Sequence, residues 1–358
     1  MSKTDKHIPK NIRHLDLEEL KAFFAGKGEP SFRATQVHEW LWKKSAHSFD
    51  DMSNLSKTIR EVLKENFVID DIQTVTSQIS KDGTIKNAFQ LHDGKMVEGV
   101  LIPSDKRMTA CISSQVGCSL ECKFCATGRL KRERNLDAGE IYDEVVFIQK
   151  QALERYATPL TNIVYMGMGE PLLNYSNVLG SIEKITSPDG LNLSPQRITL
   201  STAGIAKMIK QLGDDEVRFN LALSLHAATD EKRTQIMPIN ESNPLEDIRE
   251  ALRHFYRKTK TRVTYEYIVF RDFNDTQEDV QHLAEFCKVV PSKVNLIEYN
   301  PIEKDSQFQQ TSSERLGMFV RYLRSRDIIV NVRRSRGKDI DAACGQLANK
   351  VVKEAILR

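Results

Sequence analysis

From about Val97 onward, short apolar runs typical of β-strands alternate with amphipathic stretches typical of helices. The apolar runs are ACIS, NIVYMG, RITLST, RFNLALSLH, RVTYEYIVF, VNLIEYN and DIIVNVR. Such alternation predicts parallel strands that are connected by crossover helices. Because no GxGxxG follows any of these runs, a partial barrel is a better interpretation than a doubly wound nucleotide-binding sheet. We therefore expect an α/β fold built as a partial (β/α)6 barrel.

The chain before the barrel has a different pattern. Apolar residues recur at helical spacing in two places, Leu17, Leu20, Phe23 and Phe24, and then Val37, Trp40 and Leu41. Residues 1–70 are therefore predicted to form a small helical accessory domain. Residues 71–96 contain Gly83 and Gly94 and indicate a connector of short strands. The barrel is expected over residues 97–347, followed by a C-terminal tail over residues 348–358.

The composition is that of a globular protein of the cytoplasm. The chain has 358 residues, of which 40% are hydrophobic and 28% charged, and its net charge is +3. Its first residues, MSKTDKHIPK, are polar, and no stretch approaches the length of a membrane span. We expect neither secretion nor membrane insertion. In such a chain, six cysteines are more consistent with metal binding or catalysis than with a disulfide framework.

Three cysteines, Cys118, Cys122 and Cys125, lie within the string CSLECKFC. Three thiolates on one loop can hold three irons of a four-iron cluster and leave the fourth iron open to an exogenous ligand. No other cysteine or histidine lies between Cys118 and Asp137, so a tetrahedral zinc site would need a distant donor. An open iron that binds S-adenosylmethionine (SAM) can reduce its sulfonium and release a carbon radical. A radical enzyme is our leading hypothesis, with structural zinc and a redox-active or disulfide-forming CxxC pair as alternatives.

Small or polar residues follow four consecutive predicted strands, in the strings MGMGEP, STAG, SLH and YNP. Sites in β/α barrels lie at the carboxyl ends of the strands, so these residues should line one mouth. Ordinary turn chemistry is the alternative explanation for each residue alone. The residues expected at this mouth are Gly167, Gly169, Glu170, Ser201, Ser224, His226 and Asn300.

Three further cysteines do not fit the cluster spacing. Cys344, in DIDAACGQL, is followed by a glycine that permits an exposed turn, and the basic run RRSRGK before it favours a thiolate. It is therefore a candidate catalytic residue. Cys111 lies at a predicted strand end, and Cys287 is interpreted as a small buried hydrophobic residue.

Basic residues are clustered more than the net charge suggests, and the first two clusters could contact a polyanion such as RNA. The third cluster ends a predicted helix, where a solvated helix terminus explains it equally well. The clusters are Arg129, Lys131, Arg132 and Arg134; Arg333, Arg334, Arg336 and Lys338; and Arg253, Arg257, Lys258, Lys260 and Arg262.

Taken together, the strings CISSQVGCSLECKFCATG, MGMGEPLLN, ITLSTAG, SLHAATDEKR, YNP and DIDAACGQL resemble the radical SAM adenine-C2 methyltransferases that modify 23S ribosomal RNA and tRNA. The likeness runs in order from about residue 98 to residue 347, and the N-terminal region resembles the accessory domain of that family. It implies that Cys118, Cys122 and Cys125 bind a [4Fe-4S] cluster. It further implies SAM contacts from Gly169, Glu170, Ser201, Ser224, Leu225, His226 and Asn300.

The resemblance also implies a covalent route. Cys344 would first accept a methyl group, whose carbon would then add to the adenine and link protein to RNA. Cys111 would resolve this adduct and form a disulfide with Cys344, and Glu98 would be the proton acceptor. Such a route has a chemical rationale, because C2 of adenine offers no lone pair to a methyl donor and covalent catalysis divides one difficult step into easier ones.

The remaining implications concern the product and the partners. A related subfamily methylates C8 of the same ribosomal adenosine and commonly has GEA where this chain has Gly169, Glu170 and Pro171, so Pro171 favours C2. The segment ATGRLKRERNL lacks the glutamine-rich form of some C2 enzymes. Expected partners are 23S rRNA, tRNA and an electron donor such as a flavodoxin or ferredoxin. A zinc-stabilised RNA-binding module without catalysis is the alternative from another class.

Overall fold

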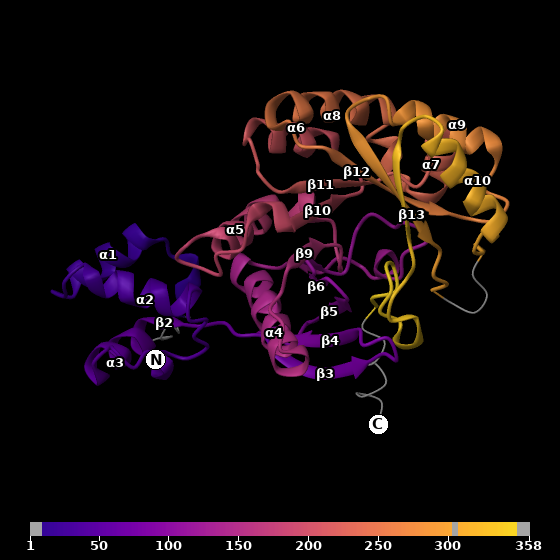
Figure 1. Cartoon of the computed structure of the whole chain (residues 1–358). Helices are drawn as coiled ribbons and strands as arrows, with labels where there is room; N and C mark the ends of the chain where they lie inside the picture. The colour runs from indigo at the N-terminus through magenta and orange to yellow at the C-terminus, as the bar shows by residue number, and fades with distance from the viewer. Residues whose placement is uncertain (1–8, 303–306, 349–358) are drawn as a thin grey trace, which may run out of the picture.

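One curved sheet of ten strands organises the molecule (Figure 1). The computed structural model describes residues 9–302 and 307–348. Within them the strand order is β14-β13-β12-β11-β10-β9-β6-β5-β4-β3. The sheet from β6 to β14 is parallel, and from β3 to β6 it is antiparallel. The residues predicted as a connector therefore supply β3 and β4, the outer strands of the main sheet.

The parallel part confirms the predicted partial (β/α)6 barrel, because six strand-and-helix units run from β6 to α10 and β14 follows them. The strands are β6 (Arg107–Cys111), β9 (Asn162–Tyr165), β10 (Ile198–Thr202), β11 (Asn220–Ser224), β12 (Val263–Val269), β13 (Ser292–Glu298) and β14 (Ile329–Arg333). The helices are α4 (Ala138–Tyr156), α5 (Tyr175–Thr186), α6 (Ala206–Asp214), α7 (Asp230–Ile236), α8 (Leu245–Thr259), α9 (Gln277–Phe286) and α10 (Ser313–Arg324).

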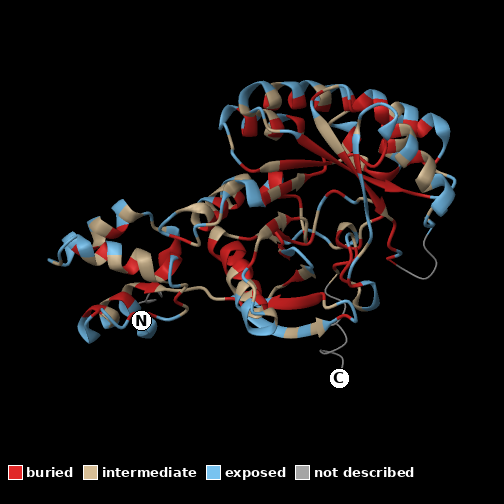
Figure 2. Cartoon of the chain, in the orientation of Figure 1, coloured by how far each residue is buried: buried red, intermediate tan, exposed pale blue. Residues whose placement is uncertain are grey.

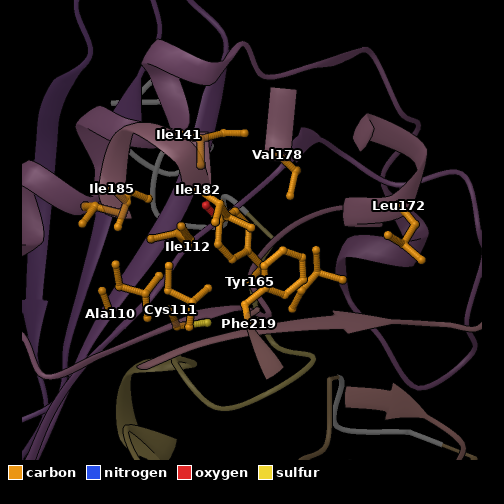
Figure 3. Close-up of a cluster of buried hydrophobic side chains, with 14 of the residues drawn as sticks. Ala110, Cys111, Ile112, Ile141, Tyr165, Leu172, Val178, Ile182, Ile185 and Phe219 are labelled. Carbon is orange, nitrogen blue, oxygen red and sulfur yellow. The ribbon is translucent and has the colours of Figure 1, made fainter. Parts of the chain in front are cut away.

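The core lies between the strands and the helices that cover the outside of the sheet (Figure 2). All seven residues of β12 are buried, as expected for a strand covered on both faces. Apolar side chains at the end of β6 and on α4 and α5 pack together, among them Ala110, Ile112, Ile141 and Ile182 (Figure 3). This packing fixes the carboxyl ends of the strands relative to one another.

The antiparallel strands are β3 (Gln73–Ile79), β4 (Ile85–Gln90) and β5 (Met96–Ser104). A second small sheet joins β7 (Gln115–Val116) to β8 (Arg134–Asn135), on either side of the cysteine loop. Short 3-10 helices are η1 (Ile12–His14), η2 (Phe49–Asp51), η3 (Thr127–Arg129), η4 (Pro171–Asn174), η5 (Pro195–Arg197), η6 (Pro238–Glu241) and η7 (Lys338–Ile340).

The region before the sheet is helical, and its helices are α1 (Leu17–Gly26), α2 (Phe32–Trp42) and α3 (Lys57–Asn66). The two apolar patterns of the sequence lie on α1 and α2. Asp16 begins α1 with a capping box in which it and Glu19 satisfy each other's backbone N–H groups. The strands β1 (Lys10–Asn11) and β2 (Phe67–Val68) bring the two ends of this helical region together. Arg13 joins it to the barrel, because its guanidinium lies 2.5 Å from the buried Asp143 carboxylate of α4.

No helix in the described part of the chain combines the length and the apolar character that crossing a membrane requires. Of the predicted C-terminal tail, only Ala348 is described, and residues 349–358 lie outside the described residues.

Candidate active site

A cavity of about 290 Å³ lies at the carboxyl ends of the parallel strands. Most of the strand-end residues meet there, as the sequence predicted for a β/α barrel, although Asn300 does not line the cavity. The three cysteines of the loop, Cys111 and Cys344 line the same cavity. Among the predicted site residues, those lining the cavity are Cys111, Cys118, Cys122, Cys125, Gly167, Gly169, Glu170, Ser201, Ser224, His226 and Cys344. The lining does not include Glu98, Leu225 or Asn300.

The cysteine loop follows a tight turn at Gly117. With φ at +76°, Gly117 is in the left-handed region, and a Cβ there would lie 2.2 Å from the Lys131 carbonyl oxygen. The Cys118 N–H donates to Leu130 O at 3.2 Å, which closes the loop. Leu120 and Phe124 pack against the three cysteines. In these apolar surroundings, burial raises the pKa of the Cys118 thiol to about 11 and raises the pKa values of Cys122 and Cys125 as well.

The loop after β9 is shaped by a close backbone approach at Gly169 and by the hydrogen bonds of Glu170. A Cβ on Gly169, whose φ is +97°, would lie 2.6 Å from Gln115 Cβ, so only glycine fits. The Glu170 carboxylate accepts the N–H groups of Leu172 at 3.0 Å and Ala203 at 2.7 Å, and burial raises its pKa. Glu170 therefore ties the end of β9 to the end of β10 while it lines the cavity.

The ends of β10 and β11 present two hydroxyl groups and an imidazole. Ser201 Oγ and Ser224 Oγ are 3.3 Å apart. His226 adopts φ of +54°, and its Nδ1 accepts the Ile268 N–H at 3.1 Å, which requires that nitrogen to be unprotonated. Burial lowers the pKa of His226 to about 3, so the ring is neutral at physiological pH. Leu225 contributes its backbone here, because its N–H donates to Glu266 O at 3.0 Å.

Two functional candidates were missed by sequence reasoning. Glu266, in the middle of β12, lines the cavity, and its Oε1 accepts from Asn295 Nδ2 at 2.7 Å. Its Oε2 is buried and has no hydrogen-bond partner among the described residues. Arg233 of α7 is fully buried and donates to Ala203 O, Ser224 O, Leu225 O and Asn240 Oδ1. The sequence signal for Glu266 was a charged residue within the apolar run RVTYEYIVF. Nothing in the sequence distinguished Arg233 from a solvated residue on a helix.

Cys111 and Cys344 line the same cavity from opposite ends of the sequence. Cys111 ends β6 beside Ala110 and Ile112, and burial raises the pKa of its thiol (Figure 3). Cys344 is exposed toward the cavity, yet surrounding protein atoms desolvate its thiol and raise its pKa, an effect that the nearby Arg333 opposes. All six cysteines lie within the described residues and are free thiols. Asn300 contacts this loop, since its Nδ2 lies 3.5 Å from Cys344 O.

Glu98 lies under the loop that carries Cys344. Its Oε2 accepts the Ala348 N–H at 2.8 Å, and its Oε1 lies 3.8 Å from Lys86 Nζ. Both oxygens of this buried carboxylate therefore face charged or N–H groups of the protein.

Comparisons with known proteins define the class. A model of the radical SAM superfamily matches residues 112–287, and a model of the ribosomal RNA large subunit methyltransferase N-terminal domain matches residues 10–69. The crystal structure of a radical SAM methyltransferase from Sphaerobacter thermophilus superimposes with a TM-score of 0.88 at 38% identity, covering 95% of this chain and 99% of that one. The fold is thus that of a radical SAM methyltransferase, a class that uses a [4Fe-4S] cluster and SAM.

Curated relatives narrow the assignment further. The chain is 62% identical to the probable dual-specificity RNA methyltransferase RlmN of Christiangramia forsetii over 96% of its own length and 98% of that protein. It is 60% identical to the protein of the same description from Cytophaga hutchinsonii, over 99% and 97% of the two chains. The chain belongs to the RlmN family of dual-specificity RNA methyltransferases.

The donor set fits the cluster better than it fits zinc. Cys118, Cys122 and Cys125 come from one loop and line one cavity with the strand-end residues, and three thiolates leave the fourth iron of a cluster open to SAM. Together with the enzymatic family, this donor set argues against a non-catalytic zinc module.

Proposed function

We propose that this enzyme methylates C2 of an adenosine in 23S rRNA and in tRNA, with Cys344 as methyl carrier and Cys111 as resolving residue. The main support for this proposal is that Cys111 and Cys344, which are 233 positions apart in the sequence, line one cavity together with the three cysteines of the loop. An electron-poor aromatic carbon requires a covalent carrier and a means of release, and these two thiols can supply both.

The cofactor residues follow from the cavity. Cys118, Cys122 and Cys125 would ligate the [4Fe-4S] cluster, which when bound supplies the electron that cleaves SAM. The residues that would hold SAM are Gly169, Glu170, Ser201, Ser224, Leu225, His226 and Asn300. Five of them line the shared cavity, Leu225 contributes its backbone there, and Asn300 Nδ2 lies 3.5 Å from Cys344 O.

The two thiols and one carboxylate divide the remaining work. Cys344 would carry the one-carbon unit that becomes bonded to the adenine, and the Cys111 sulfur would then attack the Cys344 sulfur and release the base as the disulfide forms. Glu98 would accept a proton. Its Oε2 already accepts the Ala348 N–H at 2.8 Å, so Oε1, which lies 3.8 Å from Lys86 Nζ, would take the proton.

RNA would be held mainly by phosphate contacts at the rim of the cavity. Arg333, Arg334 and Arg336 are exposed and line the cavity, which favours the second basic cluster. In the first cluster, Arg134 is already committed, because it donates two hydrogen bonds of 2.7 Å to Glu140 and one of 2.7 Å to Asp93. Arg262 directly precedes β12 and so lies at the opposite end of the strands from the cavity.

We further propose that the enzyme is cytoplasmic and is reduced by a flavodoxin or ferredoxin. We also propose that the accessory domain ends at residue 70, the connector at residue 96 and the barrel at residue 347. The N-terminal match over residues 10–69 supports the first of these boundaries.

The covalent route is tested by replacing each thiol in the anaerobically reconstituted enzyme. Cys344→Ala should abolish RNA methylation while the absorbance of the iron-sulfur cluster stays unchanged. Cys111→Ala should accumulate a protein-RNA adduct that is visible on a denaturing gel. Cys287→Ala, which changes a buried cysteine outside the cavity, is the matched control and should keep its activity. Preserved turnover in Cys344→Ala would exclude the proposed carrier.

A further inference from the structure

Residues 337–348, which include Cys344, are hydrogen-bonded to other elements on both sides. On one side the partner is the turn between β3 and β4. We call residues 337–348 the Cys344 loop and residues 80–84 the outer turn. The two lie side by side at the end of β3 and β4 (Figure 1). The outer turn belongs to the strands that the sequence predicted as a mere connector.

Two aspartates exchange hydrogen bonds across this contact. Asp82 of the outer turn accepts the Gly337 N–H at 3.0 Å through Oδ2 and the Thr84 N–H at 3.0 Å through Oδ1. In return, Asp339 of the Cys344 loop accepts the Ser80 hydroxyl at 2.5 Å and the Lys81 N–H at 3.1 Å. Carboxylates that accept backbone N–H groups form strong, charge-assisted hydrogen bonds. The contact is thus reciprocal, and each of the four carboxylate oxygens accepts one of these hydrogen bonds.

Steric fit reinforces the contact at Gly337. Its φ is +65°, and a Cβ there would lie 2.7 Å from Ala342 Cβ and 2.9 Å from Thr84 Cγ2. The loop therefore approaches the outer turn as closely as a glycine allows. The outer turn is itself fixed, because Tyr156 at the end of α4 donates its hydroxyl to Gly83 O.

The far side of the Cys344 loop is held by other elements. Thr127 Oγ1 donates to Leu347 O at 2.7 Å, and Gln346 Nε2 donates to Pro301 O at 3.0 Å. Ala126 N–H donates to Gly345 O at 2.7 Å. The span between the two holders contains Cys344, so the place of the thiol in the cavity depends on both.

We propose that the outer turn, through Asp82, is a positioning element that sets where Cys344 lies in the cavity. This inference rests on the proposed function, in which Cys344 must meet first a methyl donor and then the base and Cys111. Asp82 touches none of the reacting atoms, and its effect would pass through Gly337 and the loop. Misplacement of a reacting group by about 1 Å can cost about 100-fold in rate, so a loosened holder should be measurable in turnover.

The test compares amide hydrogen exchange and methylation in Asp82→Ala, Asp82→Asn and the wild type. Alanine removes both acceptors, whereas asparagine has one acceptor oxygen for two N–H groups and must lose one hydrogen bond. Loss of a hydrogen bond to a charged group should speed exchange over residues 337–342 by about tenfold or more, with the larger effect for alanine. Turnover should fall by about tenfold, while KM for SAM and for RNA stays unchanged.

Two further variants complete the design. Asp339→Asn weakens the same contact from the loop side and should reproduce both effects. Asp105→Ala removes the same charge from the exposed turn between β5 and β6. Within the described residues, no hydrogen bond or ion pair joins Asp105 to the Cys344 loop, so this control should match the wild type in both assays.

Unchanged exchange over residues 337–342 in Asp82→Ala would overturn the proposal, and so would faster exchange with unchanged turnover. The turnover is measured as total RNA methylation, whatever position is modified. A wild-type enzyme that made a product other than 2-methyladenosine would therefore count against the proposed function, while the exchange and turnover of the variants would still decide the role of Asp82.

Discussion

Replacing Arg233 by lysine should strongly destabilise the protein. The guanidinium is fully buried and connects three segments at the mouth of the barrel, namely the ends of β10 and β11 and the helix η6. It has no carboxylate within hydrogen-bond distance among the described residues, and burial lowers its pKa to about 10. Its stabilising role therefore depends on neutral acceptors that only a planar group with five donors can reach together.

The magnitude follows from the acceptors that lysine leaves unpaired. Arg233 donates to Leu225 O at 3.2 Å, to Ser224 O at 3.3 Å, to Asn240 Oδ1 at 2.7 Å and to Ala203 O. A single ammonium nitrogen can reach about half of these groups, so about two hydrogen bonds from a charged donor are lost. At about 1.5–3 kcal/mol each, the free energy of unfolding should fall by about 3–6 kcal/mol.

Urea unfolding of the anaerobic protein, followed by circular dichroism, measures this loss. Arg253→Lys is the matched control, because Arg253 is half-exposed on α8 and its guanidinium lies 3.4 Å from the exposed Glu246 carboxylate. That control should change the free energy of unfolding by no more than about 0.5 kcal/mol. An Arg233→Lys protein within about 1 kcal/mol of the wild type would refute the view that this guanidinium holds the mouth together.

Three further predictions concern the cavity. Burial lowers the pKa of His226 to about 3 in the folded protein, whereas the ring in the unfolded chain titrates at about 6.5. Below pH 6.5 the unfolded state takes up the proton and the folded state does not, so the free energy of unfolding should fall by about 1.4 kcal/mol per pH unit. His226→Gln should remove this pH dependence in urea titrations at pH 7 and 5.5. Glu266→Gln keeps an acceptor for Asn295 but replaces Oε2, which has no hydrogen-bond partner among the described residues, with a donor. Because Glu266 pairs in register with Ser224 of β11, this variant should raise KM for SAM by about tenfold. An unchanged KM would remove Glu266 from the SAM site. Gly169→Ala should lower the free energy of unfolding by about 1–3 kcal/mol, because the new Cβ would lie 2.6 Å from Gln115 Cβ. Urea titration measures this loss, and a variant as stable as the wild type would contradict the clash.

Features with short-range signals could be predicted from the sequence. The alternation of strands and helices gave the partial barrel, and the cysteine spacing and strand-end strings gave most of the cavity lining. These signals work because a β/α barrel places the end of each strand at one mouth, so local motifs converge without any knowledge of long-range contacts.

Features that depend on long-range partners could not be predicted. Glu98 is bonded to Ala348, and Asp82 to Gly337, across about 250 residues of sequence in each case. Arg134 looked like an RNA contact because it lies in a basic run, but Glu140 and Asp93 neutralise it in the fold. The strands β3 and β4 looked like a connector, because their alternating pattern does not say which sheet they join.

Mass analysis of nucleosides from RNA treated with the reduced, anaerobic enzyme tests the central claim most directly. The account predicts 2-methyladenosine from the wild type and no methylated adenosine from Cys344→Ala. Formation of 8-methyladenosine would assign the enzyme to the other position of the same base, and 2-methyladenosine from the Cys344→Ala variant would contradict the two-thiol route itself.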